Sequence, residues 1–141
     1  MIRAETIITV PFHDIDVMEI AWHGHYVKYF EIARCALFDV IDYSHVAMRD
    51  SGYAWPVIDL HVRYAKPATF QQQLRVQATL TEWENRLKID YLITDAASGQ
   101  RLTKGHTVQV AVDMSNGEMC FVSPPVLFQR VEQARAKAGS N

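Results

Sequence analysis

The sequence changes its hydrophobic period after about residue 50, and this change most constrains the fold. Between residues 26 and 41 apolar side chains recur at steps of three and four, the period of one helix face. They are Tyr26, Phe30, Ala33, Leu37, Val40 and Ile41. From residue 57 onward apolar and polar residues alternate instead, as in a strand with one buried face. The chain therefore combines one long amphipathic helix with a one-sided sheet, and each can bury the other.

Four alternating runs predict four strands. Their apolar positions are Ile58, Leu60, Val62 and Tyr64; Leu74, Val76, Ala78 and Leu80; Leu87, Ile89, Tyr91 and Ile93; and Val108, Val110 and Val112. Asn116-Gly117 is a strong hairpin signal because both residues tolerate positive φ. We expect an antiparallel meander after Pro56, a further strand at residues 6–12, and short helices at residues 44–49 and 124–138. The predicted architecture is α+β, a curved antiparallel sheet wrapped around one long central helix, in a single domain over residues 1–141.

Charge and hydropathy exclude two classes of partner. The 14 basic and 16 acidic residues give a formal net charge of −2, without the excess of Lys and Arg that a phosphate backbone requires, so we expect no nucleic-acid partner. No apolar run approaches the roughly 18 residues of a membrane span, and residues 1–12 read as a strand and not as a signal peptide. We therefore expect a cytoplasmic protein. Cys35 and Cys120 lie in helix and strand patterns, which predicts buried, reduced thiols.

Side chains capable of chemistry crowd into residues 12–26, between the first strand and the long helix. They are His13, Asp14, Asp16, His23 and His25. Asp14 and Asp16 can be turn formers that bond nearby backbone N–H groups. A zinc or iron site would recruit His13, Asp16, His23 and His25, but the spaced ligand motif of such sites is absent. Carboxylate catalysis beside a helix N-terminus, whose free N–H groups stabilise an oxyanion, is the third interpretation. Spacing alone leaves the three open.

The same segment resembles a known family. Phe12-His13-Asp14-Ile15-Asp16, Trp22-His23-Gly24-His25-Tyr26 and Tyr29-Phe30-Glu31-Ile32-Ala33-Arg34 resemble the signature of the hotdog-fold 4-hydroxybenzoyl-CoA thioesterase family. The stretch from Val62 to Ala68 is similar to the family's strand ending in Tyr and its basic-Pro-Ala corner, and the resemblance covers residues 5–125. It implies a homodimer or homotetramer with active sites between subunits, and hydrolysis of an acyl thioester without metal or cofactor.

Position by position, the resemblance assigns the catalytic carboxylate to Asp16, acting as nucleophile or as general base. It also implies that a backbone N–H between Trp22 and Gly24 binds the thioester oxygen. His23 matches a family histidine that orients the carbonyl or water, although a plain helix-entry residue is an equal alternative. For Tyr26, Glu31 and Arg34 we expect structural roles, with Glu31 and Arg34 paired at i, i+3.

Departures from the family pattern affect the substrate pocket. Many relatives have Gly where this chain has Met18 or Glu19, and Tyr where it has Trp22. Glu19 would narrow the site or add a second carboxylate beside Asp16. Met18, the Trp-His-Gly-x-Tyr stretch and Trp55-Pro56-Val57 look most like a branch associated with polyketide and aryl-polyene synthesis, which implies an acyl carrier protein as thioester donor, with CoA as the other candidate.

Either carrier requires cations, and exposed strand positions offer several. They are Arg63, Lys66, Arg86, Lys88, Arg101 and Lys104, of which Arg63 and Lys66 belong to the family-like stretch. Two other functions stay open at this point. One is a dehydratase-like enzyme, although the His-Phe-Pro-Gly start of that family is absent. The other is a non-catalytic module that binds acyl carriers or lipids in the same cleft.

Overall fold

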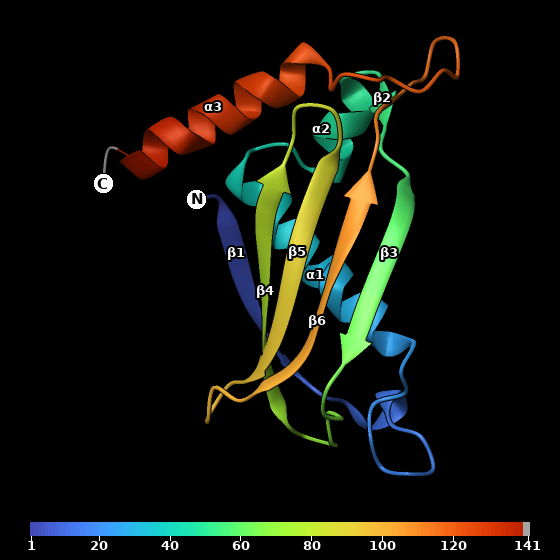
Figure 1. Cartoon of the computed structure of the whole chain (residues 1–141), viewed down its shortest axis with the longest axis vertical. Coiled ribbons are helices and arrows are strands. Elements are labelled where there is room, and N and C mark those ends of the chain that lie inside the picture. Colours follow the sequence, from blue (N-terminus) through green and yellow to red (C-terminus); the bar gives the residue numbers. More distant parts are fainter. Residues whose placement is uncertain (140–141) are drawn as a thin grey trace.

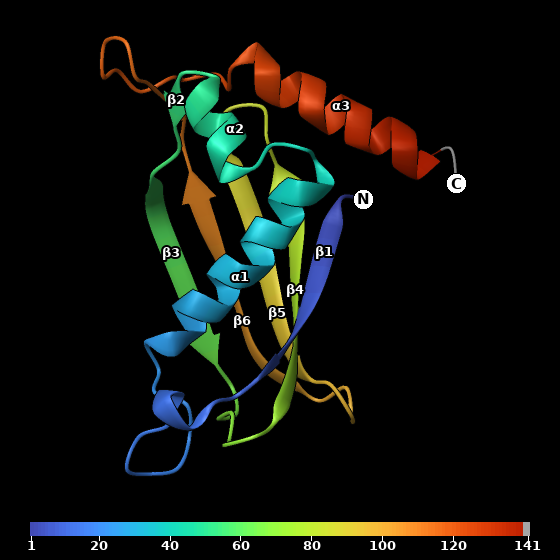
Figure 2. The same ribbon diagram turned by 180° about the vertical axis from the view of Figure 1, so that it is seen from behind.

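The computed structural model describes residues 1–139 and contains a five-stranded antiparallel sheet with one long helix against one face (Figures 1 and 2). The strand order is β1-β4-β5-β6-β3. The main elements are β1 (Arg3–Thr9), α1 (His25–Val40), α2 (His45–Asp50), β3 (Val57–Tyr64), β4 (Gln73–Glu82), β5 (Leu87–Asp95), β6 (Arg101–Gln109) and α3 (Pro125–Gly139). A 3-10 turn, η1 (Phe12–Asp14), precedes α1, and β2 (Tyr53–Ala54) pairs with β7 (Val112–Asp113). The predicted α+β hotdog architecture is confirmed.

Helix α1 fills the concave face of the sheet, as its apolar period predicts. Phe30, Ala33 and Leu37 are fully buried, and the Phe30 ring stacks on Tyr91 of β5 with centroids 4.4 Å apart. Burial of a Phe or Leu side chain stabilises the fold by about 1.5–3 kcal/mol. Gly105 of β6 lies directly under Phe30, where a Cβ would come within 2.8 Å of the ring. Val40, at the last helical position, is 47 % exposed and was wrongly predicted as core.

The predicted meander is correct for β4, β5 and β6 but wrong for β3. β3 lies at the far edge of the sheet and pairs with β6, with Leu60 opposite Thr107. An alternating pattern fixes which side chains are buried but not which strand is the neighbour, so sequence order suggested the wrong partner.

Two strand boundaries also differ from the predictions. The fourth alternating run was placed at residues 108–112, whereas β6 ends at Gln109 and Val112 belongs to β7. The buried positions of β6 include Thr103 and Thr107, whose polar side chains hide the alternation. β1 ends at Thr9, before the predicted end at residue 12.

Strand β3 has a free edge with apolar side chains beside it. Leu60 and Tyr64 are 42 % and 47 % exposed and point to the α1 side of the sheet, since Tyr64 packs edge-to-face on Tyr26 of α1. Ile58 is 59 % exposed and lies at a register shift between Val57 and Asp59, which interrupts the alternation. The alternate residues Asp59, His61 and Arg63 therefore point to the opposite face.

The helical termini follow their sequence signals, whereas the cysteines do not. Ser44 caps α2 by accepting a hydrogen bond from the Ala47 N–H at 3.2 Å, and Gly52 follows α2 with φ of 91°.

Cys35 is exposed and Cys120 half-buried, both as free thiols, so the prediction of buried thiols is wrong for Cys35. The reason is that Cys35 lies outside the buried stripe of α1 that includes Phe30, Ala33 and Leu37. Within residues 1–139, no helix is both long and apolar enough to cross a membrane.

Candidate active site

Asp16 lies at the start of a tight hairpin that leads from η1 to α1. Its N–H donates to Ile20 O at 2.9 Å, the Glu19 N–H donates to Asp16 O at 2.9 Å, and Ile15 forms a bridge with Ala21. The Asp16 side chain accepts a hydrogen bond from the Met18 N–H at 2.8 Å through Oδ1. Asp16 is thus a turn former, as the first interpretation had it, but within the described residues Oδ2 accepts no hydrogen bond and the side chain is half-exposed. One oxygen fixes the carboxylate while the other stays available.

Glu19 closes this hairpin in the left-handed region, with φ of 62°. A turn followed by a left-handed residue is a common hairpin connection, and glycine takes that position without strain. Glutamate adopts this left-handed conformation only at a cost in free energy. The Glu19 side chain is exposed and makes no hydrogen bond or ion pair with the rest of residues 1–139.

The N-terminus of α1 offers free backbone donors. Gly24 is the N-cap residue of α1, and no side chain there accepts a hydrogen bond from the first N–H groups of the helix. Among residues 1–139 the N–H groups of His23 and Gly24 donate to no acceptor. The Trp22 indole covers this helix start, because a Cβ built on Gly24 would clash with the Trp22 ring. The arrangement supplies N–H groups and the positive end of a helix dipole beside an aromatic surface, which suits a carbonyl oxygen that becomes negative.

His23 connects the helix start to β3. Its carbonyl oxygen accepts a 2.6 Å hydrogen bond from the Tyr64 hydroxyl, and its ring lies edge-to-face with Tyr64 at 6.5 Å. The His23 ring is exposed and also contacts Trp22, with centroids 4.9 Å apart. Within the described residues no hydrogen bond joins His23 to Asp16. Both residues lie in the segment that connects η1 to α1.

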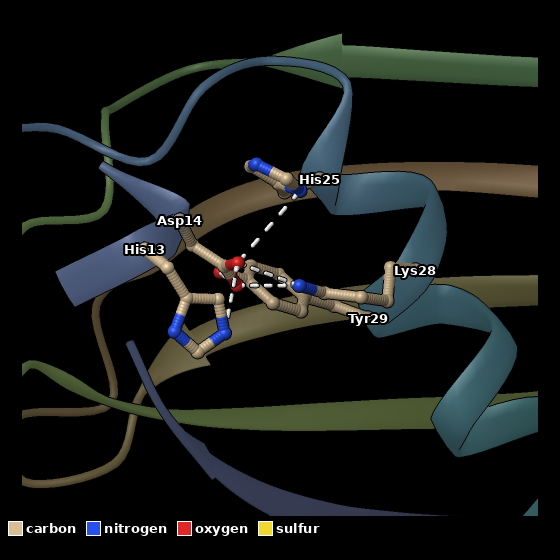
Figure 3. Close-up of polar contacts among 5 residues, drawn as sticks. All are labelled: His13, Asp14, His25, Lys28 and Tyr29. Atoms are coloured by element: carbon tan, nitrogen blue, oxygen red, sulfur yellow. Dashed lines mark hydrogen bonds and ion pairs between the residues drawn. The ribbon is translucent and has the colours of Figure 1, made fainter. Parts of the chain in front are cut away.

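Asp14, two residues before Asp16, is the buried carboxylate of the site (Figure 3). Lys28 Nζ donates to both of its oxygens at 2.7 Å, and the Tyr29 hydroxyl donates to Oδ2 at 2.7 Å. Figure 3 shows His13 and His25 on either side, each with a ring nitrogen 3.8 Å from Oδ1. Sequence reasoning treated Asp14 as a turn former and missed this network, since a contact across fourteen residues has no periodic signal.

The charges around Asp14 explain its ionisation. Burial alone would raise the pKa of Asp14, but the hydrogen bonds from Lys28 and Tyr29 and the charge of Lys28 outweigh it, so the pKa lies below its ordinary value. Burial raises the pKa of Tyr29, and the hydrogen bond to the carboxylate raises it further. Asp14 is therefore an ionised anchor and Tyr29 a neutral donor. Because Asp14 O also accepts from the Trp22 N–H at 2.9 Å, this anchor holds the hairpin against the helix start.

The two predicted cations lie differently. Lys66 is exposed on the segment that runs beside the hairpin, where the Ala21 N–H donates to Ala68 O at 2.7 Å and Ile20 bridges Thr69. Arg63 points to the opposite face of the sheet, away from Asp16. Tyr26 has the structural role that we expected, since its buried hydroxyl accepts from the Ala68 N–H at 3.0 Å.

A cavity of about 780 Å³ lies near the other end of α1. Its walls include Arg34, Cys35, Phe38, Trp55, Gln109 and Met114. The expected ion pair between Glu31 and Arg34 is absent from the described residues, and both side chains line this cavity instead. Sequence reasoning did not find the cavity because its walls come from α1, α2, β2, β3, β6 and β7, which no single pattern connects.

Comparison with known proteins decides the family. A family model described as the thioesterase-like superfamily matches residues 10–133. The chain belongs to this superfamily. A Synechocystis protein provisionally named an esterase is 25 % identical over 138 residues, covering 93 % of this chain and 80 % of the relative. A Bacillus subtilis protein provisionally named an acyl-CoA thioesterase is 25 % identical over 107 residues, covering 75 % and 77 %.

Solved structures show that this thioesterase-like chain has the hotdog fold. A DHNA-CoA thioesterase from Staphylococcus aureus superposes with a TM-score of 0.83 at 24 % identity, covering 99 % of this chain and 93 % of the other. A 1,4-dihydroxy-2-naphthoyl-CoA thioesterase from Synechocystis gives 0.80 at 20 % identity, covering 90 % and 93 %. Fold alone does not fix a substrate, so residues of this chain must supply that argument.

Proposed function

We propose that this thioesterase-like protein hydrolyses an acyl-CoA thioester to the free acid and CoA, with Asp16 as the reacting carboxylate. The observation that supports this most directly is the half-exposed Asp16 beside a helix start whose His23 and Gly24 N–H groups are free. A carboxylate and two oxyanion donors are the minimum that metal-free acyl transfer requires. The superfamily match supports the same reaction class.

In the proposed reaction the thioester oxygen accepts hydrogen bonds from the free N–H groups at the start of α1. Asp16 Oδ2 either attacks the carbonyl carbon, so that the thiolate leaves and water cleaves the resulting mixed anhydride, or takes a proton from a water that attacks instead. Both routes yield the acid and the thiol. The Met18 N–H holds Oδ1 in either case. We assign the orientation of the thioester or water to the exposed His23 ring.

We propose a homodimer formed along the free edge of β3. Tyr64, at the end of β3, is bonded to His23, whereas Val57, at its start, lines the cavity. Antiparallel pairing of two β3 strands reverses one copy, so the Asp16 hairpin of one chain lies beside the cavity of the other. One site then combines the catalytic loop of one copy with the acyl cavity of the second. Two such dimers can further assemble into a tetramer.

CoA is the donor that we favour. The support is Lys66 beside the hairpin and the names of the relatives, which include acyl-CoA thioesterases. An acyl carrier protein is the second candidate donor, and Arg63 on the outer face would then contact the carrier. Because CoA thioesters are cytoplasmic metabolites, we also propose a cytoplasmic location.

Replacement of Asp16 by Asn tests the proposal. Asp16→Asn keeps the turn acceptor for the Met18 N–H but removes the reactive oxygen, so thiol release from a panel of acyl-CoA substrates should fall by about 10³-fold or more with folding unchanged. Asp90→Asn, the same change at an exposed position on β5, is the matched control. Undiminished turnover in Asp16→Asn would overturn the assignment.

The same assay separates the two alternative functions. A non-catalytic acyl-binding module binds the acyl-CoA saturably and releases no thiol from any donor. A dehydratase-like enzyme converts a 3-hydroxyacyl thioester to the unsaturated thioester and also leaves the thioester bond intact. Thiol release with acyl-CoA and with acyl carrier protein, compared at equal concentration, identifies the donor.

A further inference from the structure

Two histidines stack on the face of the sheet that points away from α1. His61 of β3 lies directly across from His106 of β6, and their rings are nearly parallel with centroids 5.4 Å apart. Gly105 faces Phe30 of α1, so the alternation along β6 places His106 on the outer face. His61 is exposed on the free edge strand, and neither ring makes a hydrogen bond within the described residues. Both imidazoles are therefore available to a ligand.

One copy of the chain does not complete a metal site at this pair. Imidazole is a good ligand for Zn²⁺, Cu²⁺ and Ni²⁺, and a structural zinc ion takes four ligands. Asp59 also lies here, with a carboxylate oxygen 3.8 Å from His106 Nε2. However, no group of three or more His, Cys, Asp or Glu side chains in residues 1–139 is arranged to hold a metal ion. An ion bound at the histidine pair must take further ligands from a second chain.

The symmetry of the proposed β3–β3 dimer restricts which residues of the second copy meet this pair. β3 is the last strand on one side of the sheet (Figure 1), and two copies that pair antiparallel along it are related by a two-fold axis normal to the sheet. Side chains directly opposite each other share a face, so the axis passes at a residue that faces its own copy. Over the regular part of β3, residues 59–64, the candidates nearest the middle are Leu60, His61 and Val62.

The charges on the outer face of β3 select His61. An axis at His61 places Asp59 of each copy opposite Arg63 of the other, and an axis one residue earlier or later loses both of these pairs. Arg63 lacks such a partner within one copy. It lies across from Lys104 of β6 and makes no ion pair among the described residues, although like charges directly opposite each other destabilise a sheet. The second copy supplies the missing carboxylate.

We infer that the two His61 side chains of the dimer, with His106 of each copy beside them, bind one divalent transition-metal ion where the two β3 strands meet. Directly opposite side chains in an antiparallel pair have Cβ atoms about 4.5–5.5 Å apart, so two imidazoles can reach one ion at about 2.0–2.1 Å. The inference rests on the dimer proposed above and not on the hydrolysis. The ion lies on the outer face of the sheet, so it joins the two copies and takes no part in the reaction at Asp16.

Calorimetric titration of the metal-free protein with Zn²⁺ tests the site. We expect one ion per two chains, whereas Mg²⁺, which prefers oxygen ligands, should not bind there. His61→Gln should abolish the binding and His106→Gln should weaken it about tenfold or more. His45→Gln, at an exposed histidine of α2, is the matched control and should keep it. Absence of binding in the wild type, one ion for every single chain, or unchanged binding in His61→Gln or His106→Gln would overturn the inference.

Sedimentation tests the link between the ion and the dimer. An ion that binds only the dimer shifts the equilibrium toward it, so Zn²⁺ should lower the dissociation constant of the dimer about tenfold or more in the wild type and leave it unchanged in His61→Gln. A wild-type protein that stays monomeric with and without Zn²⁺ would refute both the dimer and the site.

A charge exchange tests the register in which the strands pair. Asp59→Arg or Arg63→Asp alone places like charges opposite each other at two positions and should raise the dissociation constant of the dimer about tenfold or more. The double variant restores opposite charges at both positions and should recover dimerisation and Zn²⁺ binding. A double variant no better than the single variants would show that His61 does not face its own copy, which removes the site.

The metal site and the proposed hydrolysis fail separately. Thiol release by a protein that binds no Zn²⁺ would remove this site and leave the hydrolysis. Binding of one Zn²⁺ per dimer without thiol release from any donor would do the reverse.

Discussion

Lys28 Nζ lies 2.7 Å from both carboxylate oxygens of Asp14, joining the first turn of α1 to the loop that precedes the Asp16 hairpin. Asp14 is 1 % exposed, so the ion pair is shielded on the carboxylate side, while the Lys28 side chain is 44 % exposed. This pair positions the hairpin and does not touch the site where the thioester would bind.

Asp14→Asn should therefore lower stability more than turnover. An amide accepts from Lys28 with one oxygen only and brings a competing NH₂ donor, and loss of a charge-assisted hydrogen bond to a partly exposed partner costs about 2–3 kcal/mol. Urea unfolding of the wild type and of Asp14→Asn measures the difference, with Asp90→Asn expected to change stability by less than about 0.5 kcal/mol. An equal effect of the two substitutions would show that Lys28 contributes nothing to the anchor.

The depressed pKa of Asp14 predicts an acid dependence of stability with a definite sign. A carboxyl whose pKa is lower in the folded than in the unfolded state stabilises the fold above the unfolded value of about 3.9, and loses this as pH falls through the folded value. The free energy of unfolding should thus fall more steeply between pH 5 and pH 3 in the wild type than in Asp14→Asn. The pKa values of Glu82, Asp95 and Asp113 are also lowered in the folded protein. These residues are present in both proteins, so their contribution to the pH dependence of unfolding cancels in the comparison.

Sequence reasoning located α1 and the buried faces of β4 and β5 because both follow a local period. Tyr26 to Ile41 matches His25–Val40 within one residue, since each apolar position is set by neighbours three or four residues away. The turn at Asp16, the helix start and the resemblance to a thioesterase family were likewise accessible from adjacent residues.

The features of the fold and of the site that the sequence did not predict depend on contacts between distant segments. Asp14 with Lys28, β3 with β6, and Gln109 with Trp55 are each separated by at least fourteen residues and have no repeating signal. The sequence suggested that the Glu19 side chain narrows the site or adds a carboxylate beside Asp16, and this stays a prediction. The structure shows a left-handed backbone conformation at Glu19, which the sequence does not indicate.

Glu19→Gly should stabilise the protein or leave it unchanged, despite the greater freedom of glycine in the unfolded chain. Relief of the left-handed conformation gains about 1 kcal/mol, which offsets the entropic cost of glycine, about 0.5–1 kcal/mol. Met18→Gly changes the preceding residue, whose φ is not positive. This variant carries only the entropic cost of glycine and should lower the stability of the protein. Thermal unfolding of the two variants makes the comparison, and a larger loss in Glu19→Gly would contradict the strain.

Gly24→Ala tests whether the Trp22 indole and the helix start act together. The backbone of Gly24, with φ of −71° and ψ of −21°, accepts alanine, so the added methyl group acts only by displacing the Trp22 ring. We expect kcat/KM to fall by about tenfold or more as the site is distorted. In a Trp22→Ala background the methyl group has nothing to displace, and Gly24→Ala should then change kcat/KM by less than about twofold. An equal loss of kcat/KM in both backgrounds would show that Gly24→Ala does not act through the Trp22 ring.

Leu60→Asp tests the proposed pairing of two β3 strands. Leu60 is 42 % exposed on the helix side of the free edge, so a carboxylate there remains hydrated in a monomer but would be buried against its own copy in the dimer. We expect the wild-type protein to sediment at about twice its 16.1 kDa chain mass or more, and Leu60→Asp to sediment as a folded monomer. Ile7→Asp, at similar exposure on the other edge strand β1, should keep the wild-type mass. Thiol release should fall together with dimerisation in Leu60→Asp, because the Asp16 hairpin then lacks the cavity of a second copy. A fully active Leu60→Asp monomer would show that one chain contains the whole site and would remove the need for the partner.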